Sequence, residues 1–145
     1  MSSRVAEFEE TFWKRHSNPK SGWSRTILLP AILYAIYYRN WKVAVAAVIF
    51  TVINPLLFDP PEDNDAWMTR VVLAEQWWKE ESRGFIGLSY PNVLTVVNIP
   101  TTIYAIVAAY RKKPVQLALA GGASMFLKFW YVAELVREYE AENKN

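Results

Sequence analysis

Residues 26–58 constrain the fold most strongly, because they form two apolar runs joined by a short basic turn around Arg39 and Lys42. No Asp or Glu occurs anywhere between Glu10 and Asp59. Helices that face water need polar residues on their outer face, and the second apolar run offers almost none. The segment therefore predicts a helical hairpin that crosses a membrane.

The same unit recurs in the second half of the chain. The pattern Pro30-x-x-x-Tyr34-Ala35-Ile36 reappears 70 residues later as Pro100-x-x-x-Tyr104-Ala105-Ile106, again followed by a basic turn. Shared spacing implies shared local geometry, so we expect Tyr34 to superpose on Tyr104. We predict a single membrane domain over residues 1–145, with an internal repeat of residues 1–58 and 59–133 and a charged C-terminal tail, residues 134–145.

Four charge-free runs are the candidate spans. They are 13, 16, 27 and 14 residues long: residues 26–38, 43–58, 84–110 and 114–127. Only the third exceeds the roughly 18 residues that a membrane helix needs. The others suffice if flanking Lys and Arg side chains reach the headgroups and Trp and Tyr occupy the interfaces. We predict an all-α integral membrane four-helix bundle made of two repeated hairpins, rather than a soluble bundle.

Two amphipathic segments, residues 5–15 and 66–82, flank the hairpins. Each gathers large apolar side chains near one helical face: Val5, Phe8 and Phe12 in the first, and Trp67, Val71 and Trp78 in the second. Within the second, Glu75 and Lys79 have the spacing of an ion pair. We predict two helices on the membrane surface, although helices packed on a soluble core would show the same pattern.

Two hairpins in series place both basic turns on one side of the membrane and the termini on the other. The turns hold five Lys or Arg without an acid, which favours the cytoplasm for the turns. The other side holds more basic residues in all, including Lys14, Arg15, Lys20 and Arg25 before the first span. We expect a multi-pass protein of the cell membrane with cytoplasmic termini.

Residues 16–25 are the most chemically varied stretch, and Pro19 and Gly22 predict a loop there. Arg25 is the candidate phosphate donor, His16 a switchable donor, and Trp23 an interfacial wall. We predict a polar pocket for a lipid phosphate or another anionic group, covered by the second amphipathic helix and formed by His16, Asn18, Ser21, Trp23, Arg25, Trp77 and Trp78. The alternative is a loop whose polar groups satisfy one another.

This stretch also carries a resemblance. Residues 12–25 resemble the opening of a family of small, functionally uncharacterised prokaryotic membrane proteins with a His-x-Asn-Pro-x-Ser-x-Trp-Ser/Thr-Arg motif. Here the motif reads His16-Ser17-Asn18-Pro19-Lys20-Ser21-Gly22-Trp23-Ser24-Arg25. The resemblance implies an integral membrane location and supplies no activity.

Residue usage excludes several kinds of chemistry. The chain has no cysteine, which removes thiolate metal sites and cysteine nucleophiles. His16 is the only histidine, so one chain cannot supply a bis-histidine haem site. The acids after the first hairpin lack the glycine and glutamate of a calcium loop and fit helix capping better: Asp59, Glu62, Asp63 and Asp65. We predict no metal and no cofactor, and the net charge of +2 without a continuous basic face argues against nucleic acid.

Polar and small residues inside the spans are further candidates. Asn54, Asn98 and Lys128 lie in or near them, and Lys128 is close enough to an end to anchor the helix. In the fourth span, Ala118-x-x-x-Gly122 and Ala120-x-x-x-Ser124 allow close helix packing. These pairs predict either packing within the bundle or a homo-oligomer through Ala118, Gly122 and Ser124.

Three functions from different classes follow. A non-catalytic membrane protein that binds lipids or partner proteins is favoured, because seven Trp residues cluster at the predicted interfaces. A small transporter or channel with its site at the repeat interface is the first alternative. A membrane enzyme acting on a lipid or isoprenoid headgroup, with His16 as acid or base, is the second, and the lack of a nearby carboxylate pair counts against it.

Overall fold

Helices make up 78% of the computed structural model, which describes residues 3–145 and shows no strand in that range. The all-α prediction is confirmed. In chain order the helices are α1 (Ser3–His16), α2 (Pro19–Arg25), α3 (Leu28–Tyr38), α4 (Trp41–Leu57), α5 (Trp67–Glu80), α6 (Asn92–Tyr110) and α7 (Pro114–Asn143).

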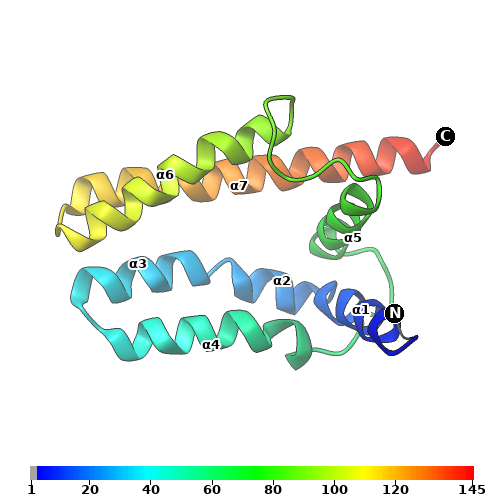
Figure 1. Cartoon of the computed structure of the whole chain (residues 1–145), viewed down its shortest axis with the longest axis horizontal. Coiled ribbons are helices and arrows are strands. Elements are labelled where there is room, and N and C mark those ends of the chain that lie inside the picture. Colours follow the sequence, from blue (N-terminus) through cyan, green and yellow to red (C-terminus); the bar gives the residue numbers. More distant parts are fainter. Residues whose placement is uncertain (1–2) are drawn as a thin grey trace.

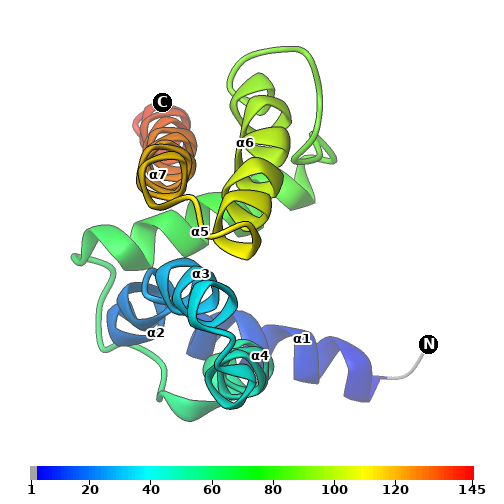
Figure 2. The ribbon, with the colours of Figure 1, turned by 90° about the vertical axis from the view of Figure 1, so that its left-hand side faces the viewer.

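Helices α3 and α4 form one antiparallel hairpin, and α6 and α7 form another (Figure 1). The two hairpins lie side by side with their turns at the same end, and α3 contacts both α6 and α7. At the other end α1 and α5 run across the hairpins rather than along them (Figure 2). The chain is thus arranged as two helical hairpins with α1 and α5 across one end.

The two hairpin turns have the same backbone geometry. Arg39 and Lys112 both adopt a left-handed conformation with φ 57°. The amide of the following residue then reaches a carbonyl five residues back, as in Asn40 to Ala35 at 2.8 Å, which is the Schellman ending of a helix. Arg39 and Lys112 are 73 residues apart, whereas the matched prolines Pro30 and Pro100 are 70 residues apart. Because the two offsets differ, the register of the predicted repeat stays a prediction.

The prediction of a loop over residues 16–25 is wrong, because most of that stretch is the helix α2. Pro19 is its first residue, where a missing N–H costs nothing. The Asn18 side chain caps the helix by accepting a hydrogen bond from the backbone N–H of Lys20 at 2.8 Å. Proline here starts a helix rather than ending one.

The first and third predicted spans also differ from the helices. Between α2 and α3 the helix breaks at Thr26 and Ile27, because Pro30 has no N–H for the carbonyl four residues earlier. The third span begins at Asn92 rather than Gly84, after a segment in which Ser82 and Gly84 have positive φ. Of residues 3–145, only α6 is long and apolar enough to cross a membrane, and α4 is a shorter apolar helix. Length and composition therefore support one membrane span, and the other three predicted spans stay predictions.

The main core joins α5 to the C-terminal half of α7. Leu135 is fully buried there and Val136 nearly so, which means that residues 134–143 of the predicted tail continue α7 as a packed helix. The other buried residues of this core are Met68, Val71, Ala74, Trp78, Leu94, Tyr131 and Val132. A smaller core between the hairpins consists of Leu33, Ala105, Ala109 and Ala120.

The two small-residue pairs of α7 face in different directions. Ala120 and Ser124 are buried inside the molecule, whereas Ala118 and Gly122 are exposed. A Cβ atom added at Gly122 would meet nothing within 4 Å. Ser124 therefore packs within its own chain, and a homo-oligomer through Ala118 and Gly122 stays a prediction.

Candidate functional site

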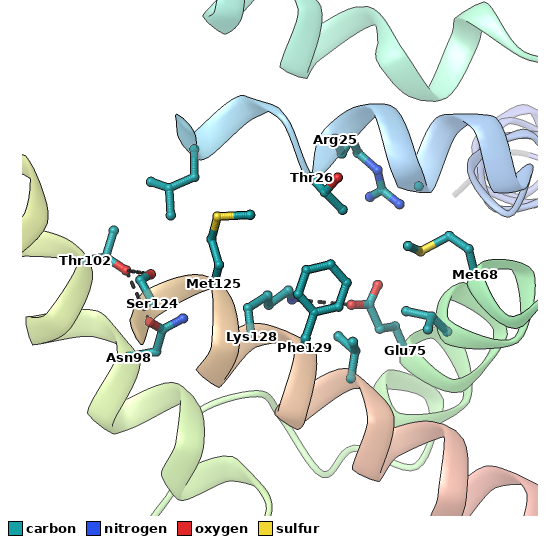
Figure 3. Close-up of a pocket in the computed structure, with 14 residues that line it drawn as sticks. Arg25, Thr26, Met68, Glu75, Asn98, Thr102, Ser124, Met125, Lys128 and Phe129 are labelled. Atoms are coloured by element: carbon teal, nitrogen blue, oxygen red, sulfur yellow. Dashed lines mark hydrogen bonds and ion pairs between the residues drawn. The ribbon is translucent and has the colours of Figure 1, made fainter. Parts of the chain in front are cut away.

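A cavity of about 400 Å³ lies where the two hairpins meet α5 (Figure 3). Four helices supply most of its wall, namely α2, α5, α6 and α7, and α3 adds Leu29. The lining residues are Gly22, Arg25, Thr26, Leu29, Met68, Val71, Glu75, Asn98, Thr102, Ser124, Met125, Lys128, Phe129 and Val132. One end of the cavity is charged, the other is polar and uncharged, and the side chains between are mostly apolar.

Three side chains make the charged end: Arg25, Glu75 and Lys128. The carboxylate of Glu75 lies 3.5 Å from Lys128 Nζ, and only 18% of the Glu75 side chain is exposed. Two cations and one carboxylate leave this end with a net charge of +1. The expected pair of Glu75 with Lys79 is wrong, because Glu75 turns toward α7 and Lys79 binds Glu9 on α1 at 2.9 Å.

Arg25 is held by neutral groups. Its Nη1 lies 2.6 Å from His16 Nε2, and its Nε donates to the backbone carbonyl of Ser21 at 3.3 Å. Neither contact neutralises the guanidinium, which stays protonated at any ordinary pH. Figure 3 shows Arg25 and Glu75 on facing sides of the cavity. Arg25 therefore presents a positive charge to the space between them.

His16 lies behind Arg25 and outside the cavity lining. It is 8% exposed and stacks on Phe12, with 5.2 Å between ring centroids. Burial and, secondarily, the positive charge of Arg25 lower the pKa of His16 from 6.5 to about 4. The ring is therefore neutral at pH 7, where Nε2 can accept a hydrogen bond from Arg25. The structure gives His16 the position of a support for Arg25 rather than a donor to a ligand.

The uncharged polar end is formed by Asn98 and Thr102 on α6 and Ser124 on α7. The hydroxyl oxygens of Thr102 and Ser124 are 2.6 Å apart, and Thr102 Oγ1 donates to Asn98 Oδ1 at 3.4 Å. Figure 3 shows the three side chains grouped at the far side of Met125 from Arg25. This cluster ties α6 to α7 and brings amide and hydroxyl groups into an apolar region.

Two of the other predicted site residues anchor α2. Ser21 is fully buried and donates to Asn54 Oδ1 at 2.6 Å, while Asn54 Nδ2 donates to Ser24 Oγ at 2.9 Å. Asn18 donates to the carbonyl of Asp59 at 2.8 Å in addition to capping α2. These contacts fix α2 against α4 and its following loop, and so fix the position of Arg25.

The predicted tryptophans take different places. Trp23 is 50% exposed and lies beside Trp67, with ring centroids 6.1 Å apart, near the cavity edge. Trp78 is 4% exposed in the α5–α7 core and donates to the carbonyl of Gly84 at 2.6 Å. Trp77 packs on Tyr139. Neither Trp77 nor Trp78 lines the cavity, which α5 instead covers with Met68, Val71 and Glu75.

Sequence reasoning placed only Arg25 in this cavity. Asn98 and Lys128 also line the cavity, and the sequence marks both as polar residues in or near a predicted span. A polar residue at membrane depth is therefore the sequence signal that could have identified them as site residues. Glu75 and Thr102 gave no comparable signal, because one sits in an amphipathic helix with other acids and the other is an ordinary helical threonine. Their role depends on which helices pack together.

A family model described as a family of unknown function, DUF6653, matches residues 2–140. The chain belongs to this family. The expectation of a functionally uncharacterised family is thus confirmed, and the DUF6653 match covers nearly the whole chain, whereas the motif in residues 12–25 and the membrane nature of the family stay predictions. A search of curated proteins and a search of solved structures each found no match. The family description assigns no function to its members.

Proposed function

We propose that this protein is a non-catalytic, multi-pass integral membrane protein that binds an anionic amphiphile in the cavity between its hairpins. The observation that carries the proposal is the cavity itself, which joins a net positive end at Arg25 to apolar walls. An amphiphile with a phosphate headgroup matches both properties.

The exposed surface of the hairpins supports a membrane location. Only 22% of the apolar window in α6 is buried. Branched apolar and aromatic side chains stand exposed along three helices: Val48, Ile49 and Val52 on α4, Ile99 and Ile103 on α6, and Leu119 and Phe126 on α7. Exposed apolar patches of this kind mark contact with lipid or protein. At about 1.5 Å per residue, α4 and α6 reach roughly 26 and 28 Å, close to the ~30 Å hydrocarbon core.

Aromatic residues lie at both ends of the hairpins, as they do in membrane interfaces. Tyr38, Trp41 and Tyr110 adjoin the turns, and Trp23 and Trp130 lie toward the α5 end, all of them exposed. In this proposal the repeated hairpins both start and end on the cytoplasmic side, and α1 and α5 lie on that face. The charged end of the cavity is then at headgroup level.

The charged end suits an anionic headgroup. A guanidinium is planar and can donate two parallel hydrogen bonds to one phosphate. Lys128 adds a second positive charge, and Glu75 holds it in place. The apolar side chains of Leu29, Met125 and Phe129 line the path beyond the charges and would contact a hydrocarbon chain.

A small transporter is the second candidate, because the cavity lies between the two hairpins, where repeat proteins often place a substrate site. The enzyme hypothesis has less support. His16 Nε2 is occupied by Arg25, and His16 does not line the cavity, so it is not placed to act as the acid or base that the hypothesis assigns to it.

The test compares binding of phosphatidylglycerol and phosphatidylcholine to the purified protein and two variants, measured by native mass spectrometry. Arg25→Gln should weaken phosphatidylglycerol binding by at least about tenfold, the usual value of a charged hydrogen bond. Lys20→Gln makes the same change of charge on the exposed face of α2 and should bind like the parent. Equal affinity of the parent and Arg25→Gln would refute the proposal.

A further inference from the structure

We propose that the amphiphile is a glycerophospholipid with ester-linked chains, and that the Asn98 amide, positioned by Thr102, donates a hydrogen bond to an ester carbonyl. This inference rests on the proposed function and specifies the class of ligand. It concerns the uncharged polar end of the cavity, which the headgroup does not occupy.

At the polar end, the amide nitrogen of Asn98 is a hydrogen-bond donor that makes no hydrogen bond to Thr102 or Ser124. The amide oxygen of Asn98 accepts from Thr102, and the Thr102 hydroxyl also contacts Ser124. A carboxamide has two further N–H donors on its nitrogen. Figure 3 shows that nitrogen turned toward the cavity. An unpaired amide donor is costly at membrane depth, so an acceptor on the ligand would stabilise it.

The distance between the two ends fits a glycerol backbone. Lys128 and Ser124 both line the cavity and lie four residues apart on α7, which is one helical turn or about 6 Å. In a glycerophospholipid the short glycerol backbone separates the phosphate from the ester carbonyls. An isoprenoid phosphate has hydrocarbon directly after its phosphate and offers no acceptor at this depth.

The polar end also leads to the lipid-facing surface. A second hollow of about 280 Å³ on α6 is lined by Thr95, Asn98, Ile99, Thr102 and Ile103, and so shares Asn98 and Thr102 with the cavity. Ile99 and Ile103 are 45% and 56% exposed. A lipid bound by its headgroup at Arg25 could therefore pass its chains across α6 into the bilayer.

The experiment titrates the full-length protein with three lipids in native mass spectrometry: diester phosphatidylglycerol, its diether analogue and a polyprenyl phosphate. The parent should bind the diester about fivefold more tightly than either of the others, as expected for one neutral hydrogen bond. Asn98→Leu should lower diester affinity to the diether value and leave diether affinity unchanged. Thr102→Val removes the hydrogen bond that positions the Asn98 amide and should reduce the preference for the diester, again without changing diether affinity.

Thr101→Val is the matched control, because the Thr101 hydroxyl bonds to the Val97 carbonyl of its own helix and lies outside both hollows. It should keep the preference for the diester. Equal binding of diester and diether by the parent, with both still weakened by Arg25→Gln, would overturn this inference and leave the proposed function standing. Binding that no longer depends on Arg25 for any lipid would overturn both.

Discussion

The side chain of His16 contacts and orients that of Arg25. A partly buried arginine usually has a carboxylate beside it, yet here the hydrogen-bonded side-chain partner of Arg25 is an imidazole at 2.6 Å. A neutral imidazole orients the guanidinium without cancelling its charge. We therefore regard His16 as a positioning residue that keeps Arg25 available for a phosphate.

His16 predicts a measurable pH dependence. Its pKa is about 4 in the folded chain and 6.5 when unfolded, so unfolding takes up a proton between these pH values. The free energy of unfolding should fall as the pH drops from 6.5 to 4, by about 3 kcal/mol, and be insensitive to His16 well above pH 6.5. Because His16 is the only histidine, a proton NMR titration of its ring reports the pKa directly. A midpoint near 6.5, or the same loss of stability in His16→Gln, would contradict the buried contact.

Helix α2 meets α5 very closely at Gly22, and this contact tests the packing at the scale of elements. A Cβ atom added at Gly22 would lie 2.0 Å from Met68 Cγ, and Met68 is 5% exposed in the main core. Gly22→Ala should destabilise the protein by about 1–3 kcal/mol through this overpacking. Gly122→Ala makes the same change where nothing lies within 4 Å, and should be neutral or slightly stabilising. Similar unfolding midpoints for the two variants would show that α2 does not pack on α5 in this way.

The sequence predicted helices well and their ends poorly, and the prolines show why. Pro19 starts α2, whereas Pro30 causes the break before α3. Pro55 and Pro100 lie inside α4 and α6 without ending them. Periodicity identifies an amphipathic or apolar helix from local residues alone. The effect of a proline depends on what satisfies the freed carbonyl, and tertiary contacts decide that.

The cavity is a property of the whole molecule. Glu75 and Lys128 are 53 residues apart, and Arg25 comes from α2, which precedes the first hairpin. Local chemistry singled out Arg25, because a varied polar stretch stood next to an apolar run. Pairing it with Glu75, Thr102 and Lys128 requires the packing of α2 on α5 and of α5 on α7, which no spacing in the sequence specifies.

We propose that both hairpins cross the bilayer and place this cavity at one membrane face. Single-cysteine labelling tests it cleanly, because the chain has no cysteine of its own. With an impermeant maleimide, Lys42→Cys at the start of α4 and Lys113→Cys in the second turn should react in intact cells, whereas Glu62→Cys and Lys144→Cys should react only after permeabilisation. Val48→Cys, on the exposed apolar face of α4, should react in neither case. Rapid labelling of Val48→Cys, or labelling of the turns and Lys144→Cys from the same side, would contradict the account.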